Sequence, residues 1–285
     1  MKQLIVAADD FGITKSVNEG IVRSHEEGIV TSLNFLPSGE AFDDALRLAK
    51  SIGLVEAGAH LALTETASVT EASRIQSLAD AGGRFYKGHI QFLLKYIAGS
   101  IDLDEVYVEW RAQLQKAIST GIRITNLSSH EHIHMLPELL DIIIKLAKEY
   151  DIPAIRYPHA DRSIRRMGMK AVGKSLALSY FAGKMTRALN AAGIMAPEHF
   201  LGFLDSGNIT EEVLLDIIVN LEDRTTELVC HPGFLGPEVL ERYRFHKNSE
   251  AELYALTSPR VKKSIADKGI NLVSYAEFLS KNEAR

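Results

Sequence analysis

Side chains that can bind a metal ion or transfer a proton follow several of the short apolar runs in this sequence. Asp9 and Asp10 come directly after the apolar run 4–8, and His60 stands near the end of the run 55–63. Arg156 and His231 likewise follow the runs 154–155 and 227–230. Two adjacent carboxylates beside a buried strand are costly unless they are paired or bound to a cation. The pattern therefore indicates one polar site assembled from several segments.

The segment 129–134, Ser-His-Glu-His-Ile-His, is the strongest single signal. It holds His130, His132 and His134, three of the ten histidines in the chain. In an extended backbone all three side chains would share a face, whereas in a helical turn only His130 and His134 would do so. Because imidazole is the commonest metal-ligating side chain, the segment predicts a metal site rather than a polar loop.

These residue types suit a metal-dependent hydrolase. One carboxylate and two imidazoles leave metal positions open for water and substrate, and a second carboxylate and a further histidine can move protons. The sequence predicts one bound divalent ion. Two imidazole ligands favour Zn²⁺ or another transition ion, but the identity of the metal is not decided, and Mg²⁺ remains an alternative. Two other interpretations remain. An iron(II) oxygenase uses the same two-histidine, one-carboxylate set, and a barrel can bind glycans without catalysis.

The elements that must position these residues alternate along the chain. Strands are expected near 4–8, 29–36, 55–63, 122–127, 154–156, 227–230 and 271–274, and helices near 14–27, 42–52 and 102–120 and from 137 and 211 onward. This alternation predicts an α/β fold with a parallel sheet. Periodicity does not distinguish an open sheet from a closed one. Polar residues at the ends of several strands favour a (β/α) barrel, whose active site lies at that edge. We expect one domain over 1–285, with an excursion around 64–88.

Composition excludes several classes of protein. The single cysteine, Cys230, rules out an internal disulfide framework and cysteine-rich zinc sites. The formal charge of −5 and scattered basic residues predict no nucleic-acid partner. The apolar run at the start is too short for a signal peptide and ends in two aspartates. No run is long enough to insert into a membrane, so we expect a cytoplasmic protein.

Taken in order, the motifs resemble those of the YdjC-like family of carbohydrate deacetylases. They are Ala8-Asp9-Asp10-Phe11-Gly12, Val30-Thr31-Ser32, Gly58-Ala59-His60-Leu61, Ser129-His130-x-His132-x-His134, Arg156-x-Pro158 and His231-Pro232-Gly233. Segments 199–207 and 226–233 are most similar to the branch associated with hopanoid biosynthesis. The resemblance implies an irregular TIM-like (β/α) barrel related to polysaccharide deacetylases, and removal of an N-acetyl group from an amino sugar or glycoconjugate.

The resemblance also implies which residues bind the metal and carry the chemistry. Asp10, His60 and His130 would bind the divalent metal. Asp9 would be the general base, and His231 the general acid that protonates the leaving amine.

Supporting roles follow from the same resemblance. Arg156 would orient Asp9, while His132 and His134 would contact substrate or support the ligands. Members of the family often carry an acid two residues before His130, where this chain has Ser128. If that acid supports His130, the metal here would be held more weakly or by a different partner.

The substrate is not specified by the sequence. A free sugar, a chitooligosaccharide and a glycosylated lipid all stay open. Segments 64–88 and 160–197 could overhang the site, and the apolar segment 176–182 fits a core or dimer helix better than a lipid contact. The sequence does not specify the oligomeric state; a homodimer stays open, since many such enzymes pair as symmetric dimers.

Overall fold

The structure is a computed structural model that describes residues 1–158, 183–203 and 205–283. The apolar segment 176–182 lies outside these residues, as does most of the stretch 160–197.

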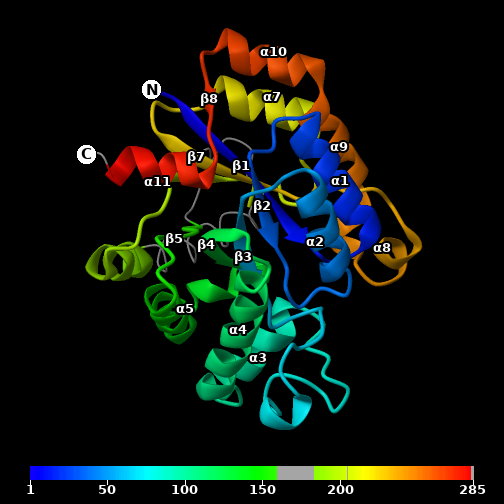
Figure 1. The fold of residues 1–285 in the computed structure, drawn as a ribbon, viewed down its shortest axis with the longest axis vertical. Helices are drawn as coiled ribbons and strands as arrows, with labels where there is room; N and C mark the ends of the chain where they lie inside the picture. The colour runs from blue at the N-terminus through cyan, green and yellow to red at the C-terminus, as the bar shows by residue number, and fades with distance from the viewer. Residues whose placement is uncertain (159–182, 204, 284–285) are drawn as a thin grey trace.

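A parallel sheet forms the centre of the molecule (Figure 1). Its strands lie in the order β5-β4-β3-β2-β1-β7-β6, and β8 pairs with the start of β1. Their bounds are β1 Gln3–Phe11, β2 Ser32–Phe35, β3 Glu56–Leu61, β4 Arg123–Ser129, β5 Ala154–Ile155, β6 His199–Leu201, β7 Thr225–Cys230 and β8 Asn271–Leu272. The sheet curls into an incomplete barrel, which confirms the irregular (β/α) barrel predicted from the sequence.

Helices surround this sheet, most of them on its outer face (Figure 1). They are α1 Lys15–Glu26, α2 Phe42–Ser51, α3 His89–Ile97, α4 Leu103–Ile118, α5 Pro137–Glu149, α7 Glu211–Val219, α8 Pro237–Glu241, α9 Ser249–Thr257, α10 Pro259–Asp267 and α11 Tyr275–Glu283, with 3₁₀ turns η1 Ala72–Arg74, η2 His130–Met135 and η4 Arg244–Asn248. Side-chain caps explain where several begin: Thr14, Asp102 and Thr210 each accept a hydrogen bond from a backbone N–H in the first turn. Among the described residues, no helix is both long and apolar enough to cross a membrane.

Alternating side chains of β1 face two different cores. Leu4, Val6 and Ala8 pack outward against the surrounding helices, in the largest apolar cluster. Ile5 packs inward against α11, in a separate small cluster. By the same alternation Asp9 also faces inward, which places its carboxylate inside the curl of the sheet.

The excursion 64–88 leaves the β/α alternation and is held down by two carboxylates of α4. Glu109 is fully buried and accepts the backbone N–H groups of Val69 and Thr70, each at 2.9 Å. Glu105 accepts the N–H and the hydroxyl of Ser77, each at 2.7 Å. These bonds satisfy backbone donors that the excursion would otherwise bury unpaired, and they hold residues 69–77 against α4.

Candidate metal centre and active site

A backbone irregularity at the end of β1 turns two adjacent carboxylates into one site. Successive residues of a strand normally point to opposite faces. Asp10 instead adopts a φ of 64°, and the pairing of β1 with β2 shifts register between Ala8 and Phe11. As a result Nε2 of His60 lies 3.7 Å from Oδ2 of Asp9 and 3.5 Å from Oδ1 of Asp10. Aspartate tolerates this left-handed conformation better than most residues, but it still carries strain.

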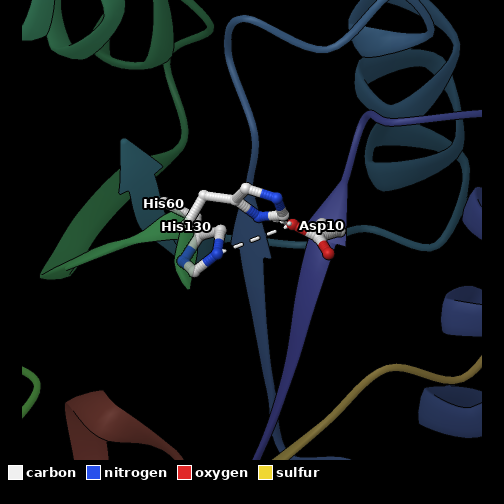
Figure 2. A group of neighbouring side chains, drawn as sticks. All are labelled: Asp10, His60 and His130. Carbon is white, nitrogen blue, oxygen red and sulfur yellow. Dashed lines mark hydrogen bonds and ion pairs between the residues drawn. The ribbon is translucent and has the colours of Figure 1, made fainter. Parts of the chain in front are cut away.

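Asp10, His60 and His130 form a compact set of ligand atoms (Figure 2). One ligand atom from each lies within 4.8 Å of the others, and all three side chains are buried. Nδ1 of His130 is 2.9 Å from Oδ1 of Asp10. One carboxylate oxygen and two imidazole nitrogens at this spacing fit a divalent ion of the zinc type, with room for further ligands.

The outer nitrogens of the two histidines have different partners. Nδ1 of His60 is hydrogen-bonded to Oγ of Ser128 at 2.7 Å. Nε2 of His130 lies 3.1 Å from Oε2 of Glu65, at the start of the excursion. Ser128 therefore contacts His60, and not His130, for which the resemblance considered position 128 as a partner. The partner of His130, Glu65, comes from a different segment.

These surroundings shift the two histidines in opposite directions. Burial lowers the pKa of His60 to about 4, against smaller opposing effects of Asp9 and Asp10. Burial also disfavours the charged form of His130, but Asp10 and then Glu65 outweigh it and hold its pKa well above the usual value. His60 is thus neutral, and His130 is positively charged and paired with carboxylates.

Asp9 is held rigidly by a buried cation. Both terminal nitrogens of Arg156 donate to its two oxygens, at 2.5 and 2.9 Å, and Nδ2 of Asn34 donates to Oδ1 at 2.7 Å. Nε of Arg156 donates to Glu227 at 2.9 Å. Burial raises the pKa of Asp9, but Arg156 and then His60 hold it far below its usual range. The carboxylate is therefore fixed in orientation, and its lowered pKa keeps it ionised near neutral pH.

His231 follows β7 at the same edge of the sheet. Its backbone N–H donates to Glu252 at 2.7 Å, and Nδ1 lies 3.5 Å from Oγ of Ser206. Burial lowers its pKa to about 4, with weaker opposing effects of Asp10 and Asp9. The ring of Phe245 stands edge-on to it, with centroids 4.8 Å apart.

The three-histidine segment adopts neither of the conformations considered from sequence. Glu131 and His132 have φ values of 53° and 54° inside η2, so the backbone is neither extended nor a continuous helical turn. Only His130 reaches the metal centre. His134 bonds through Nδ1 to Ser129 and donates from Nε2 to the carbonyl of Arg156, at 2.6 and 3.2 Å.

His132 points elsewhere and packs in an aromatic group. Its ring contacts Phe200 and Phe203, with centroids 5.5 and 5.1 Å away. His134 therefore supports the backbone that carries Arg156, while His132 packs beside it.

Several residues of the site were missed from the sequence. His246 in η4 lies with Nε2 at 3.0 Å from Oδ2 of Asp10, and Glu65 and Glu227 complete the contacts described above. Glu227 carried a usable signal, since a charged residue inside the apolar run 227–230 must have a buried partner. His246 and Glu65 stand in irregular segments, where no periodicity marks them.

A parallel (β/α) sheet with polar side chains gathered at the carboxyl ends of its strands is the arrangement of a barrel enzyme. The chain belongs to the YdjC-like family, whose sequence pattern matches residues 3–267. This confirms the family recognised from the motifs; the narrower hopanoid-associated branch stays a prediction.

Known relatives are similar to this chain over nearly its whole length. A carbohydrate deacetylase of Brevibacillus brevis is 32% identical over 277 residues, which cover 97% of this chain and 99% of the relative. A carbohydrate deacetylase of Thermoanaerobacter pseudethanolicus is 29% identical, with the same coverage. A crystal structure of a candidate cellobiose-phosphate cleavage protein from Enterococcus faecalis superposes with a TM-score of 0.75 at 28% identity, covering 97% of this chain and 98% of that one.

Proposed function

We propose that this protein is a metal-dependent carbohydrate deacetylase that removes an N-acetyl group from an amino sugar or glycoconjugate. The observation that carries the proposal is the pairing of Asp9 and Asp10 around His60, with distances of 3.7 and 3.5 Å. Asp10 is one of the candidate metal ligands, while Asp9 is held by Arg156. The names of the relatives, carbohydrate deacetylases, support the same chemistry.

Asp10, His60 and His130 would hold the ion. When bound, a divalent metal ion polarises a carbonyl oxygen and lowers the pKa of a bound water. Two imidazole nitrogens favour zinc or another transition ion over magnesium, which prefers oxygen ligands.

Asp9 would accept the proton of the attacking water. Arg156 fixes its carboxylate, so the orientation needed for proton transfer exists before substrate binds. Its low pKa makes it a weak base, so it relies on a water that is already acidified. The same low pKa means that protonated Asp9 gives its proton up readily.

His231 would protonate the amine that leaves. Because burial lowers its pKa to about 4, its ring is neutral before the reaction. It can therefore deliver a proton only after receiving one within the same turnover. The water loses one proton and the amine gains one, so the cycle between Asp9 and His231 balances.

The surroundings of His231 suit a sugar ring. Phe245 contacts His231 and is 40% exposed, so one large apolar ring stands open to solvent beside the proposed acid. Binding sites for small molecules commonly combine such aromatic surface with a few fixed polar groups. A saccharide presents both apolar C–H faces and hydroxyls, and fits this combination.

The test is acetate release from a panel containing N-acetylglucosamine, a chitooligosaccharide and a lipid-linked N-acetyl sugar. Metal-stripped protein should release none, and protein reloaded with zinc under anaerobic conditions should release acetate from at least one of them. Asp9→Asn should retain zinc and lose about 100-fold or more in turnover. Full activity of this variant would refute the role of Asp9, and activity that requires oxygen and iron would favour the oxygenase interpretation.

Several narrower expectations belong to this proposal. We infer a single deacetylase domain over 1–285, and a cytoplasmic location. A symmetric homodimer and a role for segment 64–88 in substrate binding also stay predictions.

A further inference from the structure

The two oxygens of Asp10 serve different groups. Oδ1 lies 2.9 Å from Nδ1 of His130 and 3.5 Å from Nε2 of His60, so this oxygen faces the candidate metal ligands. Oδ2 lies 3.0 Å from Nε2 of His246. His246 is 1% exposed and comes from η4, which is more than 200 residues away along the chain.

The hydrogen-bond pattern fixes which nitrogen of His246 carries a hydrogen. A carboxylate only accepts hydrogen bonds, so Nε2 must donate to Asp10. Nδ1 lies 3.2 Å from Oγ of Ser249 at the start of α9. Hydrogen-bond contacts through His246 therefore connect Ser249, at the start of α9, with Asp10 in the site.

We propose that His246 is a positioning residue that presents Oδ1 of Asp10 to the metal ion. Three observations support this assignment. The left-handed backbone of Asp10, with a φ of 64°, turns its carboxylate out of the strand alternation, and the bond from His246 holds it in that direction. Asp10 is fully buried, and loss of His246 would leave Oδ2 without this donor. The bond to Oδ2 also leaves Oδ1 as the oxygen that faces the other two candidate ligands, His60 and His130.

The inference rests on the proposed function only in requiring that a metal ion binds at this site. Outer partners of metal ligands commonly contribute about 10- to 100-fold to metal affinity. We therefore expect His246→Leu to raise the Kd for zinc by about this factor, without changing which residues bind it.

A pair of amide variants separates positioning from packing. The side-chain nitrogen of glutamine stands at the same number of bonds from Cβ as Nε2 of histidine, whereas that of asparagine is one bond shorter. His246→Gln should keep most of the zinc affinity, and His246→Asn should lose it as His246→Leu does. His25→Leu is the matched control: His25 stands near the far end of α1 and contacts the carbonyl of Val30, so zinc affinity should not change.

The measurement is zinc titration of the metal-stripped, full-length protein by calorimetry, with circular dichroism to establish folding. If folded His246→Leu binds zinc as tightly as the unaltered protein, the inference is wrong. If His246→Leu does not fold, equal affinities of the Gln and Asn variants would overturn it. Absence of zinc binding to the unaltered protein would overturn both this inference and the metal site. Zinc binding without acetate release would contradict only the proposed reaction, and the comparison of Kd values would still decide the role of His246.

Discussion

Metal binding should displace one proton from His130. Both of its ring nitrogens face carboxylate oxygens, Oδ1 of Asp10 at 2.9 Å and Oε2 of Glu65 at 3.1 Å. Carboxylates only accept hydrogen bonds, so both nitrogens carry hydrogens and the ring is a cation. The pKa of His130, which Asp10 and Glu65 raise despite burial, is consistent with this. An ion can bind a ring nitrogen only after its proton has left.

The other two ligands contribute no proton near neutral pH. Asp10 is already ionised, because His130 and His246 lower its pKa despite its burial. His60 is already neutral, because burial lowers its pKa to about 4. The expected release is therefore about one proton per ion at pH 7, whereas a histidine with an ordinary pKa would release only about a quarter of one. From pH 6.5 up to the raised pKa of His130, zinc affinity should rise about tenfold per pH unit.

Calorimetric titration of zinc at pH 7 in two buffers of different ionisation enthalpy measures this release. Glu65→Gln is the matched variant, since it removes one of the two charges that hold the proton while keeping a similar shape. Proton release at pH 7 should fall in this variant, and the pH dependence of affinity should move to lower pH. A proton lost from a zinc-bound water would contribute equally to the release in both proteins. The difference between the two proteins therefore reports on His130. Zinc affinity that does not change between pH 6.5 and 8 would refute the reasoning.

Three further substitutions test the supports of the site. Arg156→Met removes the buried cation from the two buried carboxylates beside it, Asp9 and Glu227, and should cost about 3–5 kcal/mol of unfolding free energy in urea titrations; a loss below about 1 kcal/mol would contradict it. Ser128→Ala removes a partner of a candidate ligand and should weaken zinc binding by about tenfold in calorimetric titrations, and an unchanged Kd would count against that contact. Gly20→Ala would bring a Cβ within 2.4 Å of the backbone of Gly233, and should lower the Tm by at least about 3 °C. Gly183→Ala should not, since no atom of the described residues lies within 4 Å of the Cβ it would add.

The edge of the sheet that carries the site was predictable from the sequence because parallel strands end at a common rim. Asp9, His60, His130 and His231 each follow an apolar run, and the structure gathers them at that rim. The direction of each side chain was less predictable. The left-handed backbone at Asp10 decides that both carboxylates face one histidine, and no local pattern marks it.

Two of the elements missed from the sequence share a physical cause. β6 is a three-residue strand, and α3 is helical although several of its apolar side chains remain exposed. Neither has the burial pattern on which periodicity depends. η4, which supplies His246, lies far from β1 in sequence, and its place is set by tertiary packing.

The charge of the outer hydrogen-bond partner differs between the two histidines among the candidate metal ligands. Ser128 is neutral and leaves His60 as a neutral ligand, ready to bind without losing a proton. Glu65 is an acid and keeps His130 protonated until a metal ion arrives. The ion must therefore compete with a proton at one ligand only, which makes affinity sensitive to pH. An acid at position 128 would impose the same competition with a proton on His60. The serine found there therefore favours zinc binding at lower pH, but it makes His60 a less basic ligand than an acid would.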